Sequence, residues 1–435
     1  MNPGSRRPAS FHATASLRHL AQRRRLDPLR RRLPDPGHMP SNLLLRLAAG
    51  TLSIAASELG GGNADWLQAQ ELIAPGEPPE DEARLPFVFV RAINLELSYS
   101  CNLACGHCLQ TPLRSRGALT WLDPGPVRAL LQQAQELDLL STCLNVTGGE
   151  TFAAGSSLLD VLAIARSLAL PVRANTNAWW GLQRAIRVGE ETFADDQALV
   201  EHLRRLGLSR IALSLDGRYS QYPELLERLI RVATLCEQWE LEYEFVATDA
   251  DPQLLNTVQQ RIAAGTDGSL LYARLTAMQM VDIGSAPPSE VRPLATAGLA
   301  ALARRSDCGS TGFHRPAILH VSPDGGVRSC LYAPGGGWHG NLHRQSLRAI
   351  LNAAARNPVL RLFERGELED FVAIHLDPWR HLYRQVEHGC GAAALIARLA
   401  ERVAELQASG GSVVSADRME QLHRRLAAEM GLAAA

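Results

Sequence analysis

The sequence predicts an α/β protein built on a partial (β/α)6 barrel of the TIM type. From residue 87 onward, strand-like apolar runs alternate with segments of helical periodicity. Six strand-then-helix units imply parallel strands joined by right-handed crossovers. Because a closed barrel of this type takes eight units, six predict an open barrel, with room for a large substrate at the mouth formed by the carboxyl ends of its strands.

The elements of the predicted barrel, residues 87–290, are assigned run by run. The first helix has a proline near its start, where a missing N–H is tolerated. The expected strands are 87–97, 142–146, 171–175, 210–216, 242–246 and a sixth around 275–283. The helices after the first five strands are expected at 124–139, 158–168, 196–206, 223–239 and 252–263.

The residues before the barrel divide into two regions. Residues 1–38 are rich in arginine, proline and serine, lack the apolar core of a secretory signal, and predict a disordered arm. Met39 precedes the helix-like run 42–47, so it is a candidate for the real start of the chain. Residues 39–86 predict short helices followed by a proline-rich linker.

The rhythm of strands and helices changes after residue 290. Ser322-Pro323-Asp324-Gly325-Gly326 separates the apolar runs 317–321 and 327–330, and this pattern predicts a β-hairpin. We assign residues 291–392 to a separate region and residues 393–435 to C-terminal helices. The last helix, from about Ala416, is amphipathic and is expected to pack on the domain or on a partner.

Composition limits the possible functions. The net charge of −1 does not suggest nucleic acid or an anionic membrane as a partner. Lysine does not occur in the 435 residues, which excludes catalysis by a lysine side chain. No apolar run reaches the length of a membrane span. Eight cysteines are a modest number for this length, so a reduced, cytoplasmic setting is expected.

Three cysteines directly follow the first predicted strand. Cys101, Cys105 and Cys108 have the spacing C-x3-C-x2-C and would lie at the carboxyl end of the sheet. Thiolates suit soft metals and are the usual ligands of iron–sulfur clusters. Three ligands for a four-iron cluster leave one iron open. Half of a zinc site is the alternative, but no matching ligand pair follows at the usual interval.

Polar residues stand where the next predicted strands end. Gly148-Gly149-Glu150 follows the second strand, where glycines would let the backbone approach a ligand closely and the carboxylate could accept from an ammonium group. Glycine pairs also mark ordinary turns. The third and fourth strands end in further polar side chains, Asn175, Asn177, Ser214 and Asp216.

The cysteine spacing, followed one βα unit later by Gly-Gly-Glu, resembles the signature of the radical S-adenosylmethionine (SAM) enzymes over roughly residues 87–345. The resemblance implies a [4Fe-4S] cluster on Cys101, Cys105 and Cys108 whose open iron binds SAM. It also implies a 5′-deoxyadenosyl radical that abstracts hydrogen from a substrate, and an electron donor such as flavodoxin or ferredoxin. The implied SAM contacts are His107 near the adenine, where the family usually has Tyr, Phe or Trp, Gly148, Gly149 and Glu150 at the amino group, and Asn175, Asn177, Ser214 and Asp216 at the ribose and carboxylate. His107 could also simply pack the loop.

Two further segments resemble radical SAM enzymes that modify ribosomally made peptides. Thr-Asn-x-Trp-Trp at 176–180 is similar to their Thr-Asn-Gly segment, with Ala178 in place of the glycine. Cys308 and Cys330, around the hairpin, resemble a SPASM or twitch auxiliary-cluster region, with Cys390 as a third ligand. Alternatively, Cys308 is catalytic and donates a hydrogen atom to a substrate radical, as a cysteine does in the peptide epimerases.

The resemblance therefore implies a radical SAM maturase that epimerises or cross-links a peptide. A radical SAM enzyme for a small metabolite is the alternative. An iron–sulfur carrier without catalysis would explain the cysteines but not Gly-Gly-Glu or the barrel. Cys143 and Cys236 fall within a predicted strand and helix and are expected to be packed thiols.

Overall fold

The computed structural model describes most of the chain. The described residues are 8, 10–22, 26–38, 43–49, 53–76, 90–105, 108, 110, 122–153, 157–216, 223–248, 252–268, 270–278, 298–304, 318–330, 338–365, 367–383, 386, 389–408 and 415–429. No helix among them is long and apolar enough to cross a lipid bilayer.

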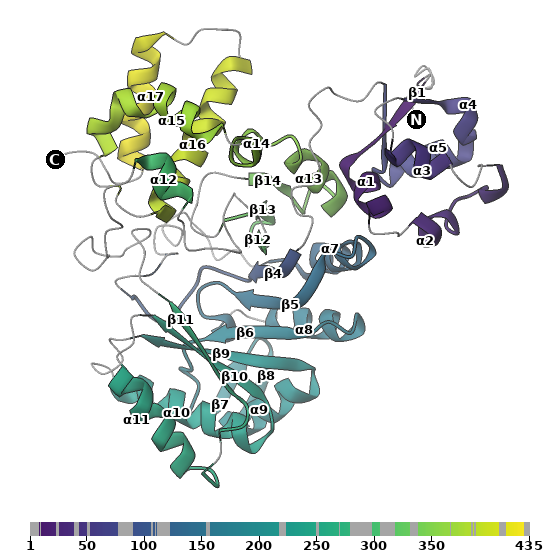
Figure 1. Ribbon diagram of the computed structural model, residues 1–435. Helices are drawn as coiled ribbons and strands as arrows, with labels where there is room; N and C mark the ends of the chain where they lie inside the picture. The colour runs from purple at the N-terminus through teal and green to yellow at the C-terminus, as the bar shows by residue number, and fades with distance from the viewer. Residues whose placement is uncertain are drawn as a thin grey trace.

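The predicted barrel is confirmed. Its six strands pair in parallel and follow one another across the sheet in chain order (Figure 1). They are β4 (Val90–Glu96), β5 (Leu140–Thr147), β6 (Val172–Thr176), β9 (Leu208–Asp216), β10 (Glu242–Thr248) and β11 (Ala273–Met278). The helices between them are α7 (Pro124–Glu136), α8 (Ser157–Ser167), α9 (Asp196–Arg205), α10 (Pro223–Gln238) and α11 (Pro252–Ala264). The short helix η2 (Thr151–Ala153) follows β5.

The two faces of the barrel strands differ in chemistry. Leu144, Ile211 and Phe245 belong to the apolar set of alternate residues, which is buried in the hydrophobic core. Asn145 and Arg173 lie on the opposite face, where the Arg173 Nη1 donates to the Asn145 Oδ1 at 2.7 Å. Parallel strands usually read as continuous apolar runs because both faces are covered. The alternation here gives the barrel a polar inner face.

The predicted hairpin is confirmed, and it extends the barrel sheet. The strands β12 (Ile318–Val321) and β13 (Gly326–Arg328) are antiparallel, and β14 (Trp338–Asn341) pairs with β13. β12 also pairs in parallel with β4, so the sheet formed by the described residues has nine strands in the order β11-β10-β9-β6-β5-β4-β12-β13-β14. The residues after the barrel thus join the strand that leads into the cysteine loop.

The prediction of a disordered N-terminal arm is wrong for the described residues. β1 (Ser10–Ala13) is the central strand of a second sheet, between β2 (Ile54–Ala55) and β3 (Ile73–Pro75). Phe11 and Leu17 are buried in this unit, and the arginine-rich composition concealed them. The helices of the unit are α1 (Ala15–Gln22), α2 (Leu26–Arg30), the 3-10 helix η1 (Pro36–His38), α3 (Leu43–Ala49), α4 (Ala56–Leu59) and α5 (Gly61–Ala69).

Helices from the C-terminal part complete the molecule. α13 (Leu347–Ala354) joins the N-terminal unit to the body, and the Ser16 Oγ donates to the Asn352 Oδ1 at 2.9 Å (Figure 1). The predicted packing of the last helix is confirmed, since Leu426 is buried. The remaining helices are α12 (Leu299–Arg304), α14 (Pro358–Arg365), α15 (Leu368–His375), the 3-10 helix η5 (Asp377–Tyr383), α16 (Gly389–Ala408) and α17 (Ala416–Glu429).

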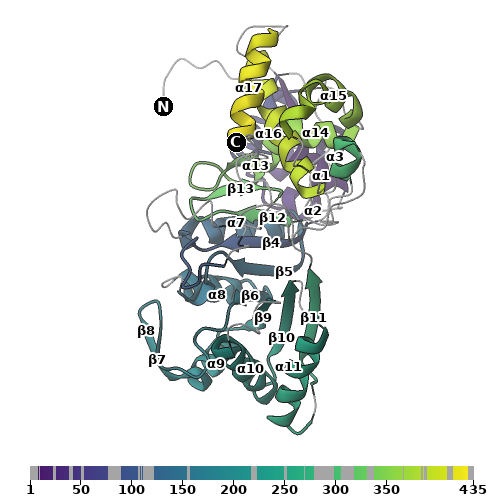
Figure 2. The same cartoon turned by 90° about the vertical axis from the view of Figure 1, so that its left-hand side faces the viewer.

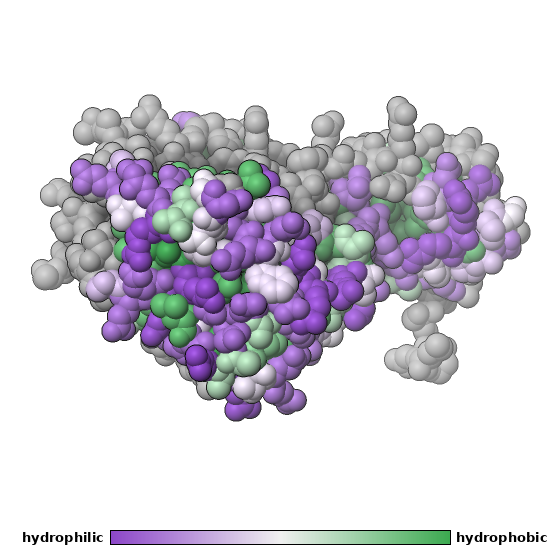
Figure 3. Space-filling view, turned by 90° about the horizontal axis from the view of Figure 1, so that it is seen from below, coloured by the Kyte–Doolittle hydropathy of each residue, from purple (hydrophilic) through white to green (hydrophobic). Residues whose placement is uncertain are grey.

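A further unexpected element lies within the barrel region. A hairpin of β7 (Arg184–Val188) and β8 (Glu191–Asp195) is inserted between β6 and α9, and it projects from the body in Figure 2. Its strands are short and mostly exposed, so they carry little apolar signal. Seen from below, this end of the molecule is largely hydrophilic with scattered hydrophobic side chains (Figure 3).

Candidate active site

The cysteine loop begins a few residues after β4 ends. Cys101, Cys105 and Cys108 are each half-buried, and His107 lies outside the described residues. The Cys108 N–H donates to the Cys105 carbonyl at 3.2 Å, and the Leu103 N–H donates to the Cys101 Sγ at 3.4 Å. An N–H that points at sulfur favours the thiolate, which is the form that binds metal.

The Gly-Gly-Glu turn after β5 packs directly on the segment that enters this loop. The Gly149 N–H donates to the Ser98 carbonyl at 2.7 Å, and the Glu150 N–H donates to the Ser100 carbonyl at 2.9 Å. A Cβ atom at Gly148 or Gly149 would collide with one of these carbonyl oxygens, and Gly148 has a φ of +129°. The glycines are therefore required by the neighbouring backbone, which brings the two sequence motifs together.

Glu150 is a buried carboxylate with three protein donors. Its Oε1 accepts from the Thr176 Oγ1 at 2.7 Å and from the Phe152 N–H at 3.1 Å, and its Oε2 accepts from the Asn177 N–H at 2.9 Å. Burial raises the pKa of Glu150 to about 7, although these hydrogen bonds lower it. None of the interactions of Glu150 within the described residues is with a cationic side chain. A carboxylate so placed favours a cationic ligand.

The polar residues at the end of β6 hold parts of the site together. The Asn177 Nδ2 donates to the Oδ1 of Asn102, inside the cysteine loop, at 2.9 Å, and the Asn177 Oδ1 accepts from the Trp179 N–H at 3.0 Å. The Asn175 Oδ1 accepts from the Arg173 Nη1 at 2.6 Å. Asn177 therefore fastens the cysteine loop to β6, a role that its position in the sequence did not reveal.

β9 brings the remaining predicted residues to the same edge of the sheet. Ser214 is half-buried and lies in register with Val246 of β10. Asp216 ends β9 in register with Thr248, and the structure does not describe its side chain. The predicted SAM contacts on β5, β6 and β9 thus end strands of one sheet, and their roles toward SAM stay predictions.

The second tryptophan of the pair supports Glu150. Trp180 is fully buried, packs against Phe152 with 5.1 Å between the centroids of the tilted rings, and donates from Nε1 to the Thr176 Oγ1 at 3.2 Å. The Thr176 hydroxyl in turn donates to Glu150. Sequence reasoning singled out neither Thr176 nor Asn102, although both lie inside the quoted motifs.

Ala178 has a φ of +60°, the left-handed conformation that glycine adopts freely. We expect Ala178→Gly to change the free energy of unfolding by no more than about 0.5 kcal/mol, because relief of ~1–2 kcal/mol of backbone strain offsets the lost methyl burial and the added chain entropy. Ala174→Gly, at an equally buried position with ordinary strand geometry, should destabilise by about 1.5 kcal/mol. Urea denaturation of both variants tests the difference, and equal losses would contradict it.

The predicted auxiliary ligands are only partly described. Cys330 is buried just after β13, Cys390 lies in the first turn of α16 without a described side chain, and Cys308 lies outside the described residues. Among the described residues, no three His, Cys, Asp or Glu side chains converge on a single-ion site.

The other two cysteines differ in burial. Cys236 is fully buried in α10, and burial raises its pKa, as expected of a packed thiol. Cys143 is half-buried on β5.

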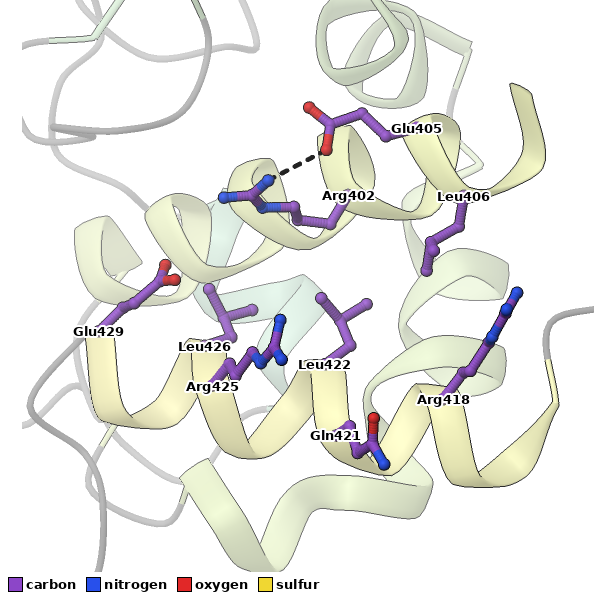
Figure 4. A pocket seen from close by; sticks show the side chains of 9 residues that line it. All are labelled: Arg402, Glu405, Leu406, Arg418, Gln421, Leu422, Arg425, Leu426 and Glu429. Atoms are coloured by element: carbon purple, nitrogen blue, oxygen red, sulfur yellow. Dashed lines mark hydrogen bonds and ion pairs between the residues drawn. The ribbon is translucent and has the colours of Figure 1, made fainter. Parts of the chain in front are cut away.

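A separate hollow of about 500 Å³ lies between α16 and α17 (Figure 4). Leucines 406, 422 and 426 and arginines 402, 418 and 425 line it, and Arg402 pairs with Glu405 at 3.1 Å. None of the predicted site residues lines this hollow. The predicted site residues that the structure describes on the barrel instead lie at or after the ends of β4, β5, β6 and β9.

Comparison with known proteins gives limited similarity. No family model matches the chain. The chain is 31% identical over 132 residues to a GTP 3′,8-cyclase from Parasynechococcus marenigrum (strain WH8102), a stretch that covers 29% of this chain and 34% of the cyclase. The chain thus spans about a third of that relative's length. A solved structure of BtrN in complex with AdoMet and 2-DOIA aligns with a TM-score of 0.35 and 12% identity, over 64% of this chain and 90% of BtrN.

Proposed function

We propose that this chain is a radical SAM enzyme, which cleaves SAM reductively and abstracts hydrogen from a substrate. The proposal rests on the packing of the Gly-Gly-Glu turn against Ser98 and Ser100, which directly precede the three-cysteine loop. In this turn, Glu150 is buried among neutral partners. The similarity to a GTP 3′,8-cyclase supports the assignment to this superfamily.

The residues present fit both groups that the proposal requires. Cys101, Cys105 and Cys108 form an all-thiol donor set on a loop at the carboxyl end of a parallel sheet, which suits a [4Fe-4S] cluster with one open iron. When bound, the cluster and SAM supply one-electron reduction and a 5′-deoxyadenosyl radical. The protein supplies position, orientation and exclusion of water.

Glu150 would hold the ammonium group of SAM. A carboxylate has about four acceptor sites, and protein donors occupy three of them, so one remains for an ammonium N–H. Thr176 and the backbone of Asn177 keep the carboxylate oriented, while the Asn177 side chain holds the cysteine loop at Asn102. His107, Asn175, Ser214 and Asp216 complete the proposed SAM contacts.

A ribosomally made peptide is the substrate we favour, by epimerisation or cross-linking, with flavodoxin or ferredoxin as electron donor. The Thr-Asn-x-Trp-Trp segment and the polar inner face of the barrel support it, because a peptide backbone offers donors and acceptors along its length. A small polar metabolite is the second candidate. The relative named GTP 3′,8-cyclase favours it.

Reconstituted protein incubated with SAM and dithionite tests the proposed function, since a mere iron–sulfur carrier should form no 5′-deoxyadenosine. A short precursor-peptide gene beside this one would supply the substrate for a second assay in D2O. Deuterium incorporation would indicate epimerisation, and loss of hydrogen from the peptide would indicate a cross-link. A small-molecule substrate would leave the peptide unchanged.

A second cluster on Cys308, Cys330 and Cys390 should double the iron content. Fully reconstituted protein is then expected to hold about eight irons, and the triple alanine variant of the first motif should keep about half of them.

If Cys308 is a hydrogen donor instead, Cys308→Ala should leave the iron content unchanged and still allow SAM cleavage, while product formation stops. A count of about four irons in the wild type would exclude the second cluster.

A further inference from the structure

A buried ion pair joins the C-terminal hairpin to the root of the cysteine loop. The Nη2 of Arg328, at the end of β13, donates to both carboxylate oxygens of Glu96, at the end of β4, at 2.7 and 2.9 Å. The side chains are 1% and 0% exposed, and 232 residues separate them in sequence. The Tyr99 hydroxyl donates to the Glu96 Oε2 at 2.8 Å.

The pair lies on the segment that carries the loop. Glu96 is in register with Thr147, directly before the Gly-Gly-Glu turn, and Tyr99 stands two residues before Cys101. Residues 98 and 100 are held by the Gly-Gly-Glu turn, while Glu96 and Tyr99 are held through Arg328. The segment that leads into the cysteine loop is therefore held by two sets of contacts. One set comes from the Gly-Gly-Glu turn, and the other comes from the C-terminal part of the chain.

The ion pair matters more for the position of the cysteine loop than for the stability of the fold. Burial shifts the pKa of each side chain against its charged form, and each partner shifts the pKa of the other toward the charged form. Apolar side chains of similar volume often replace a buried ion pair without loss of stability. Two hydrogen bonds from one guanidinium nitrogen and a third from a hydroxyl fix direction as well as distance, which apolar contact does not.

We propose that Arg328 and Tyr99 are positioning residues for the cysteine loop, which makes the hairpin β12–β13 part of the catalytic unit. The proposal rests on the proposed function. Arg328 and Tyr99 act through Glu96 and the loop backbone. Their loss should therefore alter the environment of the bound cluster in protein that is still folded.

The test compares two disruptions of this junction with a matched control. Glu96→Gln with Arg328→Met removes both charges together, so that no charge is left buried alone. Tyr99→Phe removes one hydroxyl. Glu227→Gln with Arg261→Met is the control, because the same two substitutions then remove a pair at 2.5 Å between α10 and α11. Each protein is reconstituted anaerobically. Iron content, the EPR spectrum of the reduced cluster with and without SAM, and 5′-deoxyadenosine formed per bound cluster are measured.

We expect the double variant at the junction to lose or broaden the change that SAM produces in the EPR spectrum. Its rate per bound cluster should fall by roughly 10- to 100-fold, the effect of a displacement of about 1 Å in an active site. Tyr99→Phe should weaken the EPR change and lower the rate per bound cluster as well, but less than the double variant does. The control should match the wild type in both measurements.

A wild-type EPR response and rate per cluster in the double variant would overturn the proposal, whatever its melting temperature. If the double variant does not fold, Tyr99→Phe decides, and wild-type values there overturn it. A wild-type protein that holds no cluster or makes no 5′-deoxyadenosine would instead defeat the proposed function.

Discussion

Replacement of Cys101, Cys105 and Cys108 by alanine should abolish reductive cleavage of SAM. The three thiols lie on one loop that the Gly-Gly-Glu turn and Asn177 hold against the end of the sheet. Alanine offers no ligand to iron, so the open iron that would bind SAM is lost with the cluster. We expect 5′-deoxyadenosine to fall to the level of a reaction without protein, measured by liquid chromatography after reduction with dithionite.

Cys236→Ala is the matched control for this variant. Cys236 is fully buried in α10, and burial raises its pKa, so it is an inert thiol and should not contribute to SAM cleavage. The control should keep its iron and its rate of SAM cleavage. Formation of 5′-deoxyadenosine at the wild-type rate by the triple variant would show that the cluster assignment is wrong.

The barrel could be predicted because its signal is local and repeated. Leu144, Val146, Ile211 and Leu213 belong to apolar runs that end in polar residues, and the helical segments between one run and the next imply parallel strands joined by crossovers. The same locality made the site visible, since Gly148, Glu150 and Asn177 directly follow their strands. Sequence alone could not show that the glycines are needed by the backbone of Ser98 and Ser100.

What could not be predicted depends on contacts between distant residues. In the sequence, Glu96 and Arg328 look like ordinary charged residues. They are buried together because the C-terminal hairpin pairs with β4. Phe11 and Leu17 were overlooked because the arginines around them dominate the composition, and the partners of β1 lie more than forty residues away. Burial of such residues is a property of the tertiary structure, and no local periodicity in the sequence predicts it.

Glu150 should make SAM binding depend on pH near neutrality. Its carboxyl has a pKa raised to about 7 by burial, whereas an ordinary carboxyl is ionised throughout this range. In the protein without ligand, the raised pKa contributes stability at low pH. That contribution is complete below the ordinary value of 4.5 and is lost as the pH rises through about 7. Binding of an ammonium group requires the ionised form, so ligand binding and protonation compete.

The dissociation constant of SAM should therefore rise as the pH falls below 7, by up to about tenfold per pH unit, in anaerobic calorimetric titrations of reconstituted protein without reductant. Glu150→Gln should bind SAM more weakly than the wild type at pH 8. Its affinity should change little between pH 7 and 6, because the amide does not titrate and the α-amino group of SAM is already mostly protonated there. Iron content and melting temperature serve as controls, since the glutamine N–H2 group must face one of the donors from Thr176, Asn177 or Phe152. Equal affinity of the two proteins at pH 8, or the same pH dependence in both, would show that Glu150 does not hold the ammonium group.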